Sequence, residues 1–221
     1  AHLHIYDINK TNVIGAYTEK NNRKDGELGT ELVHGDKIVV EYFEPKSVKF
    51  HGNFRISNVI HGYRSLSSIQ HSLAKGLNSS GDCNIDVNCP LGVGWDNEIR
   101  SVAMIVVNGN GICTGALINN TCNDGTPYFL TANHCLGGST GSWAFRFNWE
   151  SPPGTESCAT TAGSTDPGPP YDQTANGATI LTNSSASDYA LLEINNMTLS
   201  DAQAWNCFFA GWDASDLTTV T

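Results

Sequence analysis

A histidine and an aspartate, each beside an apolar stretch, are the residues of this chain best suited to proton transfer. His134 follows residues 128–133 and stands directly before Cys135, while Asp188 opens the apolar run 189–194. A carboxylate next to a core strand is costly to bury unless it accepts hydrogen bonds, and an imidazole N–H is a suitable donor. Together they would form the Asp–His half of a Ser–His–Asp triad, in which the histidine takes a proton from a serine.

Each of the two residues also has an ordinary structural interpretation. A lone histidine at a strand end is more often a satisfied core or rim residue, and an aspartate before a strand is commonly a turn residue. The surroundings of His134 favour catalysis, because Cys135 is adjacent and Cys113 lies one strand earlier. A bridge between these cysteines would hold the backbone that carries His134, and a catalytic base needs such rigidity.

Residues 83–221 predict an antiparallel β domain. Six stretches are apolar or alternate between apolar and polar residues, and turns separate them. They are 101–107, 112–118, 128–131, 143–149, 178–181 and 189–194. Six antiparallel strands suit a small closed barrel, which leaves no exposed strand edge. We expect a loop over residues 151–176, which are rich in Pro, Gly, Ser and Thr, and no helix of useful length.

Residues 1–65 contain no cysteine and predict a separate, small, sandwich-like β domain. Residues 38–43 are β-rich and end before Pro45, and residues 53–60 mix polar and β-branched residues. Residues 66–82 lack a strand pattern and predict a linker, with Lys75-Gly76 as a candidate processing point. An ordinary surface loop is an equally good interpretation of this segment.

The composition argues against several classes of partner and cofactor. Asp and Glu total 22 and Lys and Arg 12, a net charge of −10, whereas nucleic acids and anionic membranes require a basic surface. No apolar run is long enough to span a membrane. His2 and His4 lie at strand spacing on one face, but two histidines without a third ligand make a poor metal site. We expect neither a metal nor a cofactor.

The cysteines indicate an oxidising compartment. All seven follow position 82, and none has the C-x-x-C spacing of a zinc ribbon. In this acidic chain with few charges they favour disulfides and therefore a secreted protein. Residue 1 is an alanine and no leader opens the chain, so we expect a signal peptide to have been removed. Seven is odd, so one cysteine must be free or bonded to a partner outside the chain.

Three stretches together resemble the core signatures of trypsin-like serine proteases, in the order found in that family. They are Cys113-Thr-Gly-Ala-Leu117, Leu130-Thr-Ala-Asn-His-Cys135 and Asp188-Tyr-Ala-Leu-Leu192. Four others are similar to the bacterial lysyl endopeptidases and their secreted relatives: residues 83–90, 117–121, 123–130 and 210–213. The resemblance implies the first barrel of a trypsin-like protease, with His134 as general base and Asp188 as the acid that orients it.

The resemblance also implies a disulfide pattern. The bridges that it implies are Cys113–Cys135 and Cys89–Cys158. It gives Cys83 a partner near the family's C-terminus, so Cys83 is expected to be unpaired within the chain. Cys122 and Cys207 are additions to the family pattern, and we treat them as a candidate pair.

Residues 1–65 resemble, less specifically, the region that precedes the protease domain in precursors of this family. The similar stretches are 15–18, 33–36, 40–45 and 58–64. In the family this region is a propeptide. The resemblance therefore implies a domain that acts as a folding aid or intramolecular inhibitor and is removed in or near residues 66–82.

The nucleophile of the family lies in a Gly-x-Ser-Gly-type turn, which has no counterpart in residues 1–221. We expect the serine, the oxyanion hole and the specificity pocket to lie in a missing second barrel. The expected function is that of a secreted bacterial serine endopeptidase precursor that hydrolyses protein or peptide substrates, with a preference for lysine implied by the resemblance. The chain by itself is expected to be inactive.

Two other functions remain open. The chain could be a non-catalytic binding or adhesion protein on a decayed protease scaffold, since a fold does not fix a function. The presence of both His134 and Asp188 argues against that interpretation. Residues 1–65 could instead form a carbohydrate- or surface-binding module, with Tyr42, Phe43 and Tyr63 as candidate contact residues, although core packing is the simpler role for them.

Overall fold

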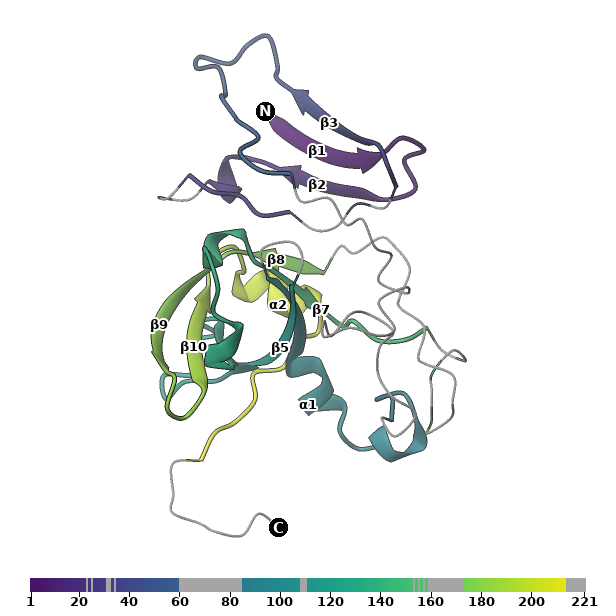
Figure 1. The fold of residues 1–221 in the computed structure, drawn as a ribbon, viewed down its shortest axis with the longest axis vertical. Coiled ribbons are helices and arrows are strands. Elements are labelled where there is room, and N and C mark those ends of the chain that lie inside the picture. The colour runs from purple at the N-terminus through teal and green to yellow at the C-terminus, as the bar shows by residue number, and fades with distance from the viewer. Residues whose placement is uncertain are drawn as a thin grey trace.

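The computed structural model describes residues 1–22, 24, 26–30, 33, 35–59, 85–107, 111–152, 154, 156, 158 and 173–213. These residues form one sheet of three strands, one sheet of seven strands and two helices of six residues. Figure 1 shows the smaller sheet lying over one end of the structure that the larger sheet builds. The expected all-β class is therefore confirmed. The expected linker, residues 66–82, lies outside the described residues.

The N-terminal sheet is a single layer. Its strands are β1 (His2–Asp7), β2 (Val13–Tyr17) and β3 (Ile38–Phe43), paired antiparallel in the order β2-β1-β3. The strand expected over residues 38–43 is confirmed, whereas residues 53–59 form no strand. Tyr6 and Ile14 are the buried apolar residues described in this domain. Two such residues cannot fill the space between two packed sheets, so the described part has no second layer.

The larger sheet contains all six strands that the sequence predicts, and one more. The strands are β4 (Val102–Val107), β5 (Gly111–Ile118), β6 (Tyr128–Thr131), β7 (Ala144–Phe147), β8 (Thr174–Asn176), β9 (Ala178–Ser184) and β10 (Tyr189–Ile194). Their order is β8-β7-β4-β5-β6-β10-β9, and every neighbouring pair is antiparallel. The additional strand, β8, falls at the end of the stretch expected to be a loop.

The two ends of this sheet meet at Gly177, which separates β8 from β9. The N–H of Gly177 donates to the carbonyl of Trp143 beside β7 at 2.8 Å, and its carbonyl accepts from Asn195 after β10 at 2.9 Å. Gly177 has φ +70, in the left-handed region that glycine enters without steric cost. β8 and β9 therefore act as one strand with a sharp corner, which pairs with both edges and closes the expected six-stranded barrel.

Apolar side chains fill the barrel interior. Ile105, Leu117, Phe129 and Leu192 each have an exposed fraction of 0%. They come from four strands, and Phe129 lies opposite both Leu117 and Leu192 in the strand pairing. The rings of Phe129 and Phe145 meet edge to face with centroids 5.1 Å apart. The period-two alternation of the sequence thus corresponds to the inward and outward faces of the strands.

Replacing Gly177 with alanine should destabilise the barrel. A Cβ at φ +70 meets the neighbouring carbonyl, which costs about 1 to 2 kcal/mol in the free energy of unfolding. Urea unfolding followed by tryptophan fluorescence measures this change. Gly211→Ala is the control, because a Cβ there has open space and Gly211 has no positive φ. Equal unfolding midpoints for the two variants would contradict the role of the corner.

Candidate active site

His134 and Asp188 stand at the ends of two neighbouring strands. His134 lies in the single 3-10 turn η4 (Asn133–Cys135), directly after β6, and Asp188 directly precedes β10. β6 and β10 are antiparallel, with Thr131 opposite Ala190. The end of one strand is therefore beside the start of the other. This pairing brings together two residues that are 54 positions apart in the sequence.

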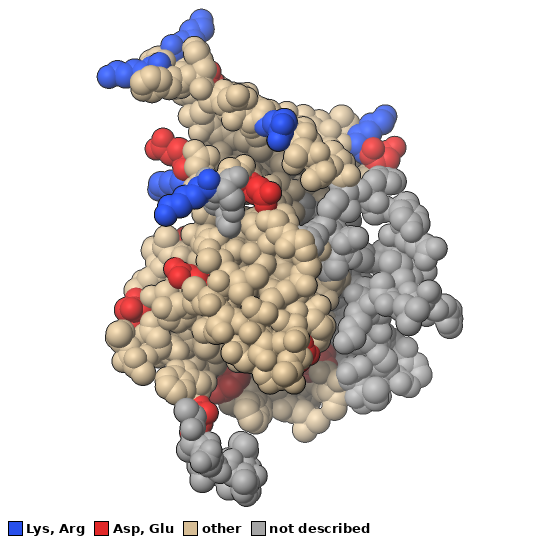
Figure 2. Space-filling model, turned by 60° about the vertical axis from the view of Figure 1, so that its left-hand side comes forward, with Lys and Arg blue, Asp and Glu red and all other residues tan. Residues whose placement is uncertain are grey.

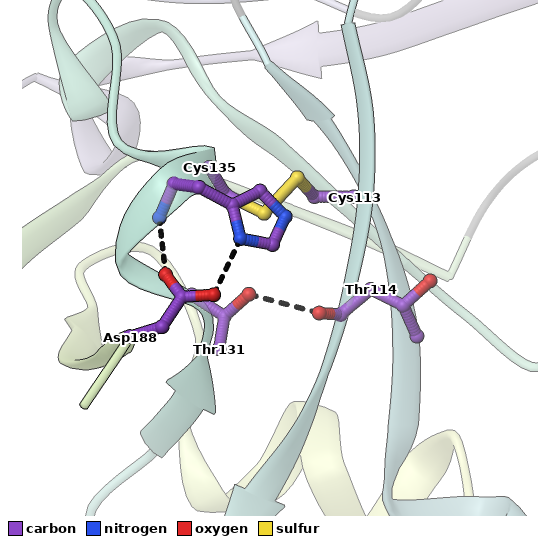
Figure 3. The surroundings of a disulfide bond; sticks show 6 residues. Cys113, Thr114, Thr131, Cys135 and Asp188 are labelled. Carbon is purple, nitrogen blue, oxygen red and sulfur yellow. Dashed lines mark hydrogen bonds and ion pairs between the residues drawn. A yellow bond between two sulfur atoms is a disulfide. The ribbon is translucent and has the colours of Figure 1, made fainter. Parts of the chain in front are cut away.

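The carboxylate of Asp188 holds both the ring and the backbone of the histidine. Its Oδ2 lies 2.7 Å from Nδ1 of His134, and its Oδ1 accepts the backbone N–H of His134 at 2.8 Å. Figure 3 shows these two contacts on the two oxygens of Asp188. An ionised carboxylate can only accept, so Nδ1 carries the ring proton. In the neutral ring Nε2 is then the free acceptor, which is the state required of a general base.

The backbone at Asp188 is itself unusual. Asp188 has φ +50, in the left-handed region. Aspartate and asparagine are among the few residues other than glycine that enter this region readily. The carbonyl of Asp188 also accepts the N–H of Asn133 at 3.2 Å. The position thus favours an aspartate for its backbone as well as for its charge.

A disulfide and a side-chain bond fix the turn that carries His134. Cys113 of β5 is bonded to Cys135, as the resemblance implied, with the two Cα atoms 6.2 Å apart. From β9, the Nδ2 of Asn183 donates to Oδ1 of Asn133 at 2.7 Å. The turn is therefore tied to β5 and to β9 on either side of the histidine. Sequence analysis missed Asn183, because a polar residue late in a strand carries no chemical signature.

The other cysteines only partly follow the expected pattern. Cys89 and Cys158 form the expected bridge, with Cα atoms 5.7 Å apart. The candidate pair of Cys122 and Cys207 is wrong, since both are free thiols. Cys122 is exposed in a turn, whereas Cys207 packs against the barrel core, where burial raises the pKa of its thiol to about 11. Cys83 lies outside the described residues.

The His134–Asp188 pair is open to solvent. The side chain of His134 is 67% exposed and that of Asp188 is 51% exposed. A substrate or another protein surface can therefore reach both residues.

The described residues provide one group with metal-ligand geometry, in which donor atoms of Cys113, His134 and Cys135 lie within 4.8 Å of one another. The two sulfur atoms are bonded to each other, so they are not thiolate ligands. The rings of His2 and His4 are adjacent, with centroids 5.1 Å apart, but that group of three does not include them. No helix of the described residues is long and apolar enough to cross a membrane.

The aromatic residues considered for a binding surface have different environments. The ring of Phe43 is stacked on His2, and Phe43 is exposed. The hydroxyl of Tyr42 donates to Glu44 at 2.8 Å, and its ring lies against Phe54. Tyr63 lies outside the described residues. The contacts of Tyr42 are therefore made within the N-terminal domain.

The hydrogen bonds to Asp188 determine the pH range over which its carboxylate stays ionised and bonded to His134. The His134 side chain, and next its backbone N–H, lower the pKa of Asp188 below the ordinary value of 3.8. A carboxyl whose pKa is lower in the folded state stabilises that state when the pH is above the ordinary pKa of the group. This contribution is lost as the pH falls through the lowered pKa of the folded state. The pair should therefore persist below pH 3.8.

A carbon NMR titration of the Asp188 carboxyl measures this pKa directly. In His134→Ala it should rise toward the ordinary value, because the largest cause of the shift is removed. Asp124 is an internal control, since the side chain of Thr126 is the main cause that lowers its pKa to about 2. An Asp188 pKa that is unchanged in the variant would contradict the pairing.

Comparison with known proteins shows which family the chain belongs to. The family model of the lysyl endopeptidase C-terminal domain matches residues 77–221, which include His134, Asp188 and both disulfides. A lysyl endopeptidase of Pseudomonas aeruginosa is 26% identical over 194 residues, covering 84% of this chain and 40% of that protein. The chain thus spans less than half the length of this relative. With two thirds of its residues matched, the chain belongs to the lysyl endopeptidase family.

Proposed function

We propose that this protein is a secreted serine endopeptidase and that residues 83–221 provide the base and the orienting acid of its triad. The observation that carries the proposal is the Asp188 carboxylate, which contacts Nδ1 and the backbone N–H of His134. That contact leaves Nε2 available to a substrate or a nucleophile. Surface ion pairs seldom combine a fixed tautomer, a rigid backbone and an open ring edge, whereas general base catalysis requires all three.

The chemistry is acyl transfer. Nε2 of His134 takes the proton of a serine hydroxyl as the serine oxygen attacks the peptide carbonyl, and it later gives that proton to the leaving amine. Asp188 stabilises the imidazolium that exists between the two steps. The serine, the oxyanion hole and the specificity pocket belong, in this proposal, to a second barrel outside residues 1–221. Residues 1–65 act as the propeptide of the precursor, or zymogen, and residues 66–82 contain the processing site.

The distribution of charge supports a cationic substrate. After Lys75 the chain contains two basic residues, Arg100 and Arg146, while acidic residues continue to its end. In Figure 2 the basic side chains gather over the N-terminal sheet, and acidic side chains dot the barrel. An acidic surface raises the local concentration of cationic peptides. This agrees with cleavage beside lysine, the activity for which the relative is named.

The test uses the full-length protein. We expect it to cleave peptides with lysine at the scissile bond faster than the same peptides with glutamate there, and to react with a fluorophosphonate probe. His134→Ala should abolish both reactions. His51→Ala is a matched control, because His51 also contacts a carboxylate, that of Glu44, at 2.5 Å in the N-terminal domain. A folded full-length protein that neither cleaves nor reacts would leave the non-catalytic binding role in its place.

A further inference from the structure

A short segment of the N-terminal domain contacts the barrel, with one buried residue at the contact. Gly29 is buried, and its carbonyl accepts a buried hydrogen bond from Nδ2 of Asn176 at 3.0 Å. Two residues earlier, Oε2 of Glu27 accepts from the hydroxyl of Ser139 at 2.5 Å. These bonds join residues more than a hundred positions apart. We call residues 27–30 the docking segment.

The docking segment and the barrel meet backbone to backbone. A Cβ added to Gly29 would lie 2.1 Å from the carbonyl oxygen of Ser142 and 2.5 Å from its Cα. Neither atom belongs to a flexible side chain, so neither can move aside cheaply. Glycine is therefore required at position 29 for this approach.

The contact falls beside the Gly177 corner of the barrel and on the η5 turn. Asn176 is the last residue of β8 and precedes the Gly177 corner. Ser142 belongs to the 3-10 turn η5 (Thr140–Ser142), which follows the η4 turn of His134 and is tied to β9 by a 2.6 Å bond from Thr140 to the carbonyl of Ala178. The docking segment thus contacts both η5, at Ser142, and the end of β8, at Asn176.

The docked N-terminal domain does not cover the catalytic pair. His134 and Asp188 keep exposed fractions of 67% and 51% with this domain in place. A propeptide that inhibits by occupying the active site would bury these side chains. The two parts differ in charge, because residues 1–65 contain nine basic and eight acidic residues, whereas the barrel is acidic.

We propose that residues 27–30 form a docking element through which the N-terminal domain binds this chain's own barrel and holds its closing corner. The domain then works as a folding aid that remains bound after the linker is cut, and not as a plug over His134. This rests on the proposed role of residues 1–65 as a propeptide. Residues 27–30 are then the residues through which that propeptide would bind the barrel.

The first test measures association after cleavage. A recognition sequence for a site-specific endopeptidase is placed between residues 66 and 82 of the chain, the folded protein is cut, and size-exclusion chromatography follows the two fragments under dilution. We expect the unsubstituted fragments to elute together. Gly29→Ala should weaken their association by about tenfold or more, because the clash involves main-chain atoms. Gly211→Ala should leave it unchanged, since a Cβ there has open space.

A second test addresses the uncut chain and a milder variant. Hydrogen exchange at the amide of Gly177, which donates to Trp143, should be faster in Gly29→Ala than in the unsubstituted chain. Ser139→Ala removes one hydrogen bond without a clash, and it should weaken association by a few fold. Unsubstituted fragments that separate on cutting would overturn the proposal, as would variant fragments that associate as tightly as the unsubstituted ones. Neither measurement uses peptide hydrolysis, so failure here is distinct from failure of the proposed protease activity.

Discussion

Replacing Asp188 with asparagine should lower kcat of the full-length protein on a lysine-containing peptide by about 10⁴-fold. Asparagine enters the left-handed backbone region as readily as aspartate does, so φ +50 at position 188 is kept. Its amide oxygen can still accept the backbone N–H of His134. The imidazole, however, loses the negative partner that holds the proton on Nδ1 and stabilises the imidazolium. The substitution therefore removes chemistry while preserving the turn.

The experiment compares kcat, KM and unfolding midpoint for Asp188→Asn and for Asp124→Asn. Asp124 is a suitable control, because its carboxylate also accepts several hydrogen bonds, from Thr126 and Asn120, at a turn of the same barrel. We expect the control to keep its kcat. A fall of less than about tenfold for Asp188→Asn would show that the His134–Asp188 contact is structural and not catalytic.

The two disulfides should contribute similarly to stability and differently to activity. They close loops with sequence separations of 69 residues for Cys89–Cys158 and 22 for Cys113–Cys135. Loop entropy in the unfolded chain then gives about 4 and about 3 kcal/mol, respectively. Only the second bridge contacts the turn of His134. Replacing Cys113 and Cys135 with serine should therefore lower kcat, whereas replacing Cys89 and Cys158 should lower only the free energy of unfolding.

Urea unfolding measures the first quantity, and peptide hydrolysis at a temperature where both double variants are folded measures the second. The Cys89/Cys158 variant serves as the control, because its stability loss is at least as large. Equal losses of kcat in the two variants would mean that the Cys113–Cys135 bridge acts through general stability and does not position His134.

The regular parts of this structure could be predicted because they follow local rules. Alternating and apolar stretches of four or more residues predicted six strands within a few residues of their bounds. The β8 strand was missed because Thr174–Asn176 has three residues, too few to show a period, and follows a stretch rich in Pro and Gly. The closing corner depends on a positive φ at Gly177, one glycine among 22 in the sequence.

The part of the candidate site that lies at strand ends could be predicted from the sequence. His134 and Asp188 each adjoin an apolar strand, and antiparallel pairing of those strands is enough to bring them together. The contact of Asn183 with Asn133 and the burial of Gly29 depend on segments that meet only in three dimensions. The odd number of cysteines required at least one of them to lack a partner within the chain. It could not show that Cys207 packs against the core and that Cys122 and Cys207 form no bridge with each other.

The corner at Gly177 has a consequence for the order in which this barrel is made. Strands β7, β4, β5 and β6 pair consecutively and are complete once residue 147 has been synthesised, so they can form an open sheet early. Residues 174–194 then bridge its two free edges. His134 belongs to the early sheet and Asp188 to the late segment, so their hydrogen bonds can form only when the barrel closes. During synthesis the histidine therefore gains its carboxylate partner at the same step that removes the exposed edges, and in an incompletely folded chain no carboxylate orients the imidazole.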